Sequence, residues 1–227
     1  MPFASSIRVD GEIPALLRAA WVGAEPVVVG PSDPALEAEM ERTLSARVEE
    51  MGDRPPAQIP ELGPAREMYR AFRIDPTRSR PSSEALLRRA LQGKPLPRIL
   101  NAVDLCNLLS LQFLLPLGLY DAEKISGAVT LRRGRPGESY PGIRKDEVHL
   151  DGRPVLSDAR GPFGNPTSDS LRTSVTVATR SLWLVIFAPA GTSTAELERY
   201  LGRAREGIER HLSPAGQAAR TRGEILC

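Results

Sequence analysis

The spacing of apolar and polar residues changes character near the middle of the chain. In the first half, apolar residues recur at helical spacing and predict helices over residues 34–51, 62–72, 84–92 and 98–114. In the second half, short apolar runs between Gly, Pro, Asp and Asn clusters predict strands at 128–132, 147–150, 155–158, 174–178 and 182–187, before an amphipathic helix over 194–211. Helices first and strands later indicate an α+β fold.

Breaks in this pattern divide the chain into three parts. Val27-Val28-Val29 predicts a short strand, and the helix after it ends before Pro55-Pro56, so residues 1–60 are expected to form an αβ extension packed on the main domain. Residues 61–212 hold most of the predicted elements and form that main domain. The polar residues 213–227 are expected to be a flexible tail.

Composition excludes several classes of protein. The 227 residues are 41% hydrophobic and 26% charged, as in an ordinary globular protein, and the net charge of +2 is too small to indicate a nucleic-acid binder by bulk charge. The N-terminal residues do not have the pattern of a signal peptide, and the apolar stretches are too short or too interrupted to span a bilayer. With only Cys106 and Cys227 as cysteines, a disulfide framework is not expected, and we predict a cytoplasmic protein without a membrane partner.

A polar stripe runs along the most apolar predicted helix. Asn101, Asp104, Asn107 and Ser110 follow one another at three-residue steps among leucines, so they share one slowly drifting face. A buried polar group without a partner costs about 1–3 kcal/mol, so this face must meet water, a polar network or a ligand pocket. These alternatives remain open from the residue pattern alone.

An ordered series of short motifs around this helix resembles the B3/4 domain, the amino-acid-editing domain of the phenylalanyl-tRNA synthetase beta subunit. The motifs are R-x-x-Y, D-P, S-x-E-x-L-x-x-R, N-x-V-D-x-x-N and P-L-x-x-Y-D, and their residues here are Arg66, Tyr69, Asp75, Pro76, Ser82, Glu84, Leu87, Arg88 or Arg89, Asn101, Val103, Asp104, Asn107, Pro116, Leu117, Tyr120 and Asp121. The resemblance covers about residues 66–189 and implies a B3/4-like fold, with mixed β-sheet structure packed with several helices.

The resemblance also implies a function. Editing domains of this family hydrolyse the ester of a misacylated tRNA, as a second sieve where one binding pocket discriminates too little. The expected ligand is aminoacyl-tRNA or a free amino acid, and no cofactor or metal is expected. The alternative is a non-catalytic module that binds RNA or an amino acid. The candidate catalytic residues are Asn101, Asp104 and Asn107, and the candidate substrate-binding residues are Arg89, Ser110, Tyr120, Arg132, Glu138, Asp169 and Thr173.

The chain departs from the family pattern at one notable position. The family commonly reads P-L-H-x-F-D, whereas this chain has Gly118 in place of that histidine. His149 alternates with apolar residues and is expected on an exposed strand face, and His211 is expected to end the last helix, so neither is predicted to be catalytic. A loop with Arg132, Arg133 and Arg135 is the expected contact for RNA phosphates.

Overall fold

The computed structural model describes residues 7–143 and 145–226, and its centre is an antiparallel sheet. The strand order is β10 (Arg220–Leu226), β2 (Leu17–Glu25), β9 (Leu182–Pro189) and β3 (Leu117–Asp121). β9 is buried on both faces, because apolar side chains that alternate along it supply two separate cores. This arrangement confirms the α+β class with mixed sheet structure.

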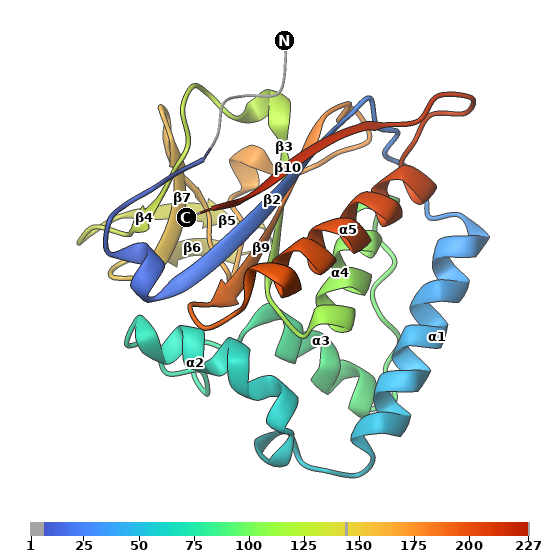
Figure 1. Ribbon diagram of the computed structural model, residues 1–227, viewed down its shortest axis with the longest axis horizontal. Helices are drawn as coiled ribbons and strands as arrows, with labels where there is room; N and C mark the ends of the chain where they lie inside the picture. Colours follow the sequence, from blue (N-terminus) through green and yellow to red (C-terminus); the bar gives the residue numbers. More distant parts are fainter. Residues whose placement is uncertain (1–6, 144, 227) are drawn as a thin grey trace.

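Helices cover one face of the central sheet (Figure 1). They are α1 (Pro34–Met51), α3 (Ser82–Leu91), α4 (Asn101–Phe113) and α5 (Thr194–His211). Asp33 caps α1, and Ser193 with Glu196 forms a capping box at the start of α5, so local signals define where both helices begin. The helices expected from the pattern of apolar residues are confirmed.

The opposite face of the sheet packs on α2 (Gly63–Ala71) and on a second sheet. The order of that sheet is β1 (Arg8–Val9), β4 (Thr130–Arg133), β7 (Pro154–Asp158) and β8 (Gly161–Gly164), with β1 parallel to β4. A hairpin of β5 (Ser139–Gly142) and β6 (Lys145–His149) stands beside it. Short 3₁₀ turns occur at Ile13–Ala15, Pro56–Gln58, Pro60–Leu62, Ala122–Lys124 and Leu171–Thr173.

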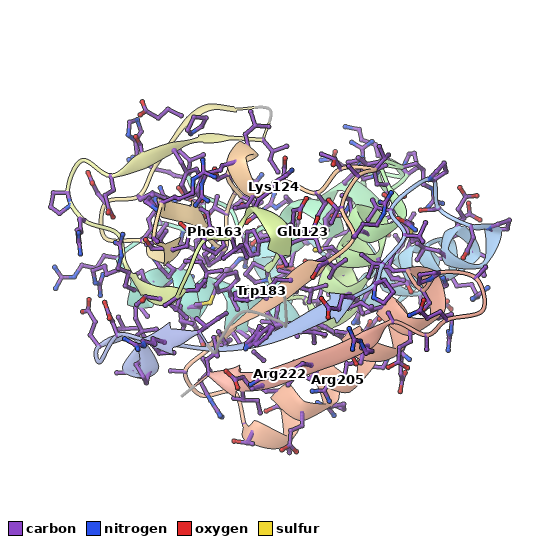
Figure 2. All side chains as sticks on the ribbon, turned by 90° about the horizontal axis from the view of Figure 1, so that it is seen from above. Glu123, Lys124, Phe163, Trp183, Arg205 and Arg222 are labelled. Carbon is purple, nitrogen blue, oxygen red and sulfur yellow. The ribbon has the colours of Figure 1, made fainter. Side chains whose placement is uncertain are left out.

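Two tryptophans mark the core between the sheets. Trp21 on β2 and Trp183 on β9 are fully buried, and their ring centroids lie 4.7 Å apart. Trp183 lies at the middle of the molecule in Figure 2. The pair therefore sits where the central sheet meets the second core.

Two predicted strands are absent from the described residues. The run Val27-Val28-Val29 is not a strand, although the Val27 and Val28 N–H groups donate to Arg180 and Leu212 carbonyls. Residues 174–178 form a turn in which the Thr179 hydroxyl accepts from the Thr176 N–H and donates to Asp121. In both places single hydrogen bonds replace a strand ladder.

The ends of the described chain differ from the expectation. β2, from the supposed extension 1–60, lies between β10 and β9, so it is an inner strand of the central sheet. Residues 220–226, expected in a flexible tail, form β10 and pair with β2 over its length. Residues 7–60 and 213–226 therefore contribute to the same cores as the residues between them.

Candidate functional site

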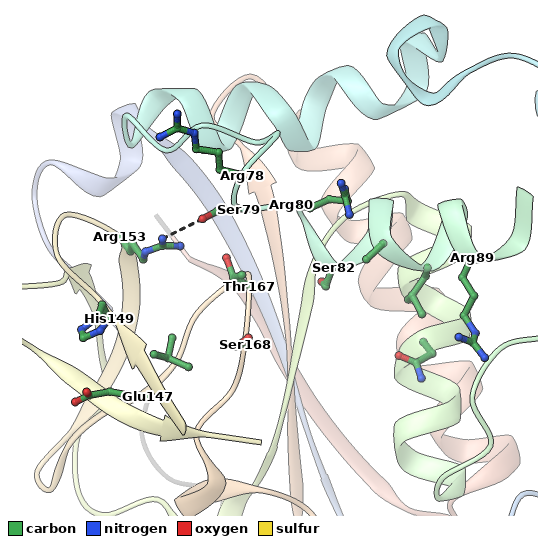
Figure 3. Close-up of a pocket in the computed structure, with 14 residues that line it drawn as sticks. Arg78, Ser79, Arg80, Ser82, Arg89, Glu147, His149, Arg153, Thr167 and Ser168 are labelled. Atoms are coloured by element: carbon green, nitrogen blue, oxygen red, sulfur yellow. Dashed lines mark hydrogen bonds between the residues drawn. The ribbon is translucent and has the colours of Figure 1, made fainter. Parts of the chain in front are cut away.

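A cleft of about 680 Å³ opens between α3 and the β6–β7 side of the molecule (Figure 3). The segment between α2 and α3 forms one edge, and the loop with Thr167 and Ser168 lies across from it. The lining residues are Arg78, Ser79, Arg80, Ser82, Ala85, Leu86, Arg89, Asn107, Glu147, Val148, His149, Arg153, Thr167 and Ser168.

The cleft is strongly cationic. Within the described residues its lining holds four arginines against the single acidic residue Glu147. This excess is larger than the net charge of +2 of the whole chain, so the positive charge is concentrated here. An anionic ligand is therefore favoured at this surface.

The first two members of the polar stripe do not face the cleft. The Asn101 amide donates to the carbonyls of Val28 and His211 at 2.9 and 3.2 Å and accepts from the Gly30 N–H at 3.0 Å. Asp104 accepts from the Ser32 hydroxyl at 2.7 Å and from the Ile99 N–H at 3.0 Å. The expectation that both line a pocket is thus wrong, because the loop before α1 covers them.

The other two members of the stripe, Asn107 and Ser110, differ from each other in whether they reach the cleft. Asn107 is half-buried and lines the cleft, as does Arg89, whose Nε donates to the Pro95 carbonyl at 2.6 Å. Ser110 is buried and donates to the Leu115 carbonyl at 2.7 Å, which ties the end of α4 to the chain that follows. Asn107 and Arg89 are therefore the predicted site residues that the structure brings together.

Tyr120 fills the space beside Gly118. A Cβ on Gly118 would lie 2.0 Å from the Tyr120 hydroxyl, and one on Gly164 would lie 2.2 Å from it. The hydroxyl donates to Asp169 at 2.7 Å, and the Leu119 N–H donates to the other oxygen of Asp169 at 3.3 Å. A histidine cannot replace Gly118 while Tyr120 keeps this position.

Asp169 has no cationic partner among the residues that the structure describes. Part of the residue is exposed, but its carboxylate points inward to Tyr120, close to Cys106 and Tyr140. Burial raises the pKa of Asp169 to about 7, against the opposing effect of the hydrogen bonds from Tyr120 and the Leu119 N–H. Neither Asp169 nor Tyr120 is among the lining residues of the cleft.

The remaining predicted substrate contacts hold the second sheet together. Arg132 is buried and forms a two-pronged ion pair with Glu138, with both hydrogen bonds at 2.8 Å. Thr173 is buried, with its hydroxyl 3.5 Å from the Phe163 carbonyl. Arg133 donates to Glu12 and to the Gly152 carbonyl. The expected phosphate-binding loop is therefore largely engaged within the protein.

A buried carboxylate also anchors the helix that borders the cleft. Glu84 on α3 accepts two hydrogen bonds from Arg66 at 2.8 and 2.9 Å and one from Arg88 at 2.8 Å. Burial raises the pKa of Glu84, but the hydrogen bonds and charges of Arg66 and Arg88 outweigh it and hold the pKa below its ordinary value. The pairing fixes α3 to α2.

The β6 strand contributes titratable groups that sequence reasoning missed. Glu147 and His149 are exposed, as expected for His149, but both line the cleft. Their two-residue spacing on a strand was the available signal, since it places them on one face. Burial raises the pKa of the Cys106 thiol, which makes it a poor nucleophile.

The loop across the cleft is positioned by tyrosines. The Tyr69 hydroxyl donates to the Pro166 carbonyl at 2.9 Å, and the Tyr140 hydroxyl donates to the Ser168 carbonyl at 2.6 Å. Asn165 accepts from the N–H groups of Thr167 and Ser168 at 2.7 and 3.0 Å. These bonds hold Thr167 and Ser168 at the cleft with a defined backbone.

The described part of the chain, residues 7–143 and 145–226, has neither a candidate metal site nor a membrane-spanning helix. No group of His, Cys, Asp or Glu side chains there is suited to hold a metal ion. No helix in the same part of the chain is long and apolar enough to cross a membrane.

Comparisons with known proteins agree on one family. The model of the B3/4 domain matches residues 64–221. Phenylalanine–tRNA ligase beta subunits from Streptomyces avermitilis and Bartonella quintana are 37% and 34% identical over 79 and 130 residues, which cover 34% and 52% of this chain. The chain spans only 10% and 15% of the length of these relatives in the two matches.

A solved structure is also similar. It is an N-terminal fragment of the phenylalanyl-tRNA synthetase beta subunit from Pyrococcus horikoshii, 14% identical, with a TM-score of 0.47 over 96% of this chain and 51% of that one. The family assignment depends on the family model, whose match covers more than half of the chain. The chain belongs to the B3/4 domain family.

Proposed function

We propose that this domain binds the aminoacylated 3′ end of a tRNA in the cleft and hydrolyses the ester that joins a wrong amino acid to the terminal ribose. The observation that carries the proposal is the cationic cleft of about 680 Å³ in a domain of the B3/4 family. The domain would act in trans, on tRNA charged by a separate synthetase. The relatives are named as beta subunits of a phenylalanine–tRNA ligase, which supports a substrate of this class.

The chemistry that this reaction requires is modest. An aminoacyl ester is activated, so a placed water, an acceptor for its proton and donors for the developing oxyanion suffice. In the cleft, the Asn107 amide is available as a donor, and Glu147 and His149 are available as proton acceptors. Asn101 and Asp104 would support the reaction only through the position of α4, because their polar groups bind neighbouring loops.

A second function is favoured by a specific observation. The position where the family pattern has a histidine is Gly118, and the side chain of Tyr120 fills the space beside it. A domain that has lost a pocket histidine can still bind the end of a tRNA or an amino acid. The alternative is therefore a binding module without hydrolytic activity.

A deacylation screen with a panel of mischarged tRNAs separates the two functions. We expect at least one aminoacyl-tRNA to be hydrolysed faster than its spontaneous rate, and Asn107→Ala to lower that rate by about 10²–10³-fold, as the loss of an oxyanion donor does. The matched control is Gln112→Ala, which removes an amide from the same helix outside the cleft lining. The melting temperature of each variant checks that the fold is retained.

The results of the binding and deacylation assays distinguish a hydrolase from a binding module. Binding of tRNA without deacylation of any species would support the binding module. Neither binding nor deacylation at low salt would contradict both functions. Because phosphate contacts release counterions, any binding should weaken steeply as salt rises.

A further inference from the structure

Two arginines away from the cleft contrast with two that line it. Away from the cleft, Arg66 and Arg172 are half-buried, and each donates two hydrogen bonds to one carboxylate. Arg66 binds Glu84 at 2.8 and 2.9 Å, and Arg172 binds Asp158 at 3.0 and 2.9 Å. In these two pairs, the charge of a half-buried arginine is balanced by a carboxylate that it binds directly.

Two arginines that line the cleft, Arg80 and Arg153, have no carboxylate within hydrogen-bond distance among the described residues. Arg80 lies 3.8 Å from Glu84, whose oxygens already accept bonds from Arg66 and Arg88, and the Arg80 side chain makes no hydrogen bond within the described residues. Arg153 donates one bond, to the Ser79 hydroxyl at 3.1 Å, and has no described carboxylate within 4.0 Å. Figure 3 shows Arg153 and Ser82 on opposite sides of the cleft, with Ser79 and Arg80 side by side on the segment above them.

The start of α3 adds donors to the same place. No side chain caps this helix, and the N–H groups of Ser82 and Ser83 have no acceptor in the described part of the chain. Ser82 lines the cleft, and its hydroxyl oxygen, which is shielded from solvent, has no hydrogen-bond partner among the described residues. A helix start with free N–H groups attracts an anion.

We infer that Arg80, Arg153 and the first turn of α3 form a phosphate-binding subsite, which takes a phosphodiester next to the terminal nucleotide of the bound RNA. This inference rests on the proposed function for the source of the phosphate. Donors on two sides of the cleft suit a tetrahedral anion with oxygens on several sides better than a planar carboxylate. Arginine forks match phosphate geometry in two-pronged pairs.

The test is equilibrium binding of a fluorescent 5′-CCA-3′ trinucleotide at low salt, beside adenosine, which has no phosphate. CCA should bind more tightly than adenosine. Arg80→Ala and Arg153→Ala should each weaken CCA binding by about 10- to 100-fold, the equivalent of a charged hydrogen bond, while adenosine binding is unchanged. The matched control is Arg42→Ala, which removes the same charge from an exposed position of α1 outside the cleft lining.

A second variant separates binding from folding at Arg153. Ser79→Ala removes the internal partner of Arg153 but leaves its guanidinium in the cleft. If Arg153 binds phosphate, Ser79→Ala should retain most of the CCA affinity. If it reproduces the loss seen with Arg153→Ala, Arg153 serves only the structure and the subsite is contradicted.

The inference and the proposed function fail in different ways. Equal affinities for CCA and adenosine, equal losses in the Arg80→Ala and Arg42→Ala variants, or no CCA binding at low salt would each overturn the subsite. Deacylation of a mischarged tRNA would leave the proposed function intact in those cases. Displacement of CCA by inorganic phosphate but not by acetate would support recognition of phosphate.

Discussion

The carboxylates of Glu84 and Asp169 both point into the protein, yet their surroundings shift the two pKa values in opposite directions. Glu84 meets arginines, and its pKa lies below the ordinary value. Asp169 meets a tyrosine hydroxyl and a backbone N–H, and its pKa rises to about 7. Burial disfavours the charge in both cases, so the difference comes from whether a cation is present.

The two groups therefore give stability opposite dependences on pH. The folded-state pKa of Glu84 is lowered, so its contribution is present above the unfolded pKa and is lost as pH falls through the folded value. Asp169 holds its proton in the folded state up to about pH 7, whereas the unfolded chain releases it near pH ~4. Its effect is a loss of stability as pH rises between these values.

The largest expected effect is at Glu84. Glu84→Gln leaves the buried end of Arg66 without a charge partner, and removing one partner of a buried pair costs about 3–5 kcal/mol. The free energy of unfolding in denaturant at pH 7 measures this loss. Glu67→Gln, on the exposed side of α2, is the matched control and should change stability by less than about 0.5 kcal/mol. If both variants lost the same free energy of unfolding, the charge pairing of Glu84 with Arg66 would not be what stabilises this region.

Tyr120→Phe should have the next largest effect. It removes the shorter hydrogen bond to Asp169, and a bond to a charged group contributes about 1.5–3 kcal/mol. We expect this loss at pH 8, where Asp169 is ionised, and a smaller loss at pH 5, where it is protonated. Unfolding curves at both pH values measure the difference. A loss independent of pH would mean that Tyr120 acts through packing alone.

Asp169→Asn should stabilise the protein at high pH. Asparagine keeps an oxygen for the Tyr120 hydroxyl and cannot ionise, so the variant should be more stable than the wild type at pH 8 by about 1 kcal/mol, with a gap that closes toward pH 4. Asp53→Asn, at an exposed position, is the control and should leave the pH profile unchanged. A pH slope retained between pH 4 and 7 in Asp169→Asn would assign it to another group.

The smallest effect is expected for Arg88→Ala. The Arg88 side chain is 35% exposed, and Glu84 keeps both bonds from Arg66 after the change. Partly exposed helix pairs contribute about 0.3–0.5 kcal/mol, so the loss should be of this size. Denaturant unfolding in low and high salt measures it, and the difference from wild type should shrink in high salt. A loss as large as that in Glu84→Gln would show that Arg88, rather than Arg66, stabilises the carboxylate.

Local signals in the sequence were sufficient for the helices. The Ser193–Glu196 capping box and the Asp33 cap lie next to the residues that they organise, so α5 and α1 could be placed from the sequence. β10 could not, because Arg220–Leu226 is mostly polar and partly exposed and becomes a strand only through pairing with β2. Long-range pairing leaves little trace in a short window of sequence.

The candidate site was predictable in part for a similar reason. The three-residue step correctly placed the polar stripe on one helix, α4. Which part of the stripe stays open depends on residues 28–32, which precede α4 by about 70 positions and cover Asn101 and Asp104. The pattern within a helix cannot show what a distant loop will cover, so only Asn107 remained at the cleft.

The contact between the two tryptophans has a consequence for circular dichroism spectroscopy. Trp21 and Trp183 are the only tryptophans of the chain, and at 4.7 Å their indole transitions are close enough to couple, which should give a paired signal in circular dichroism. That signal reports on the contact of β2 with β9 and fades when this contact opens. Ligands in the cleft should leave it unchanged, since neither indole lines the cleft. Optical unfolding and ligand binding can therefore be followed independently in the unlabelled protein.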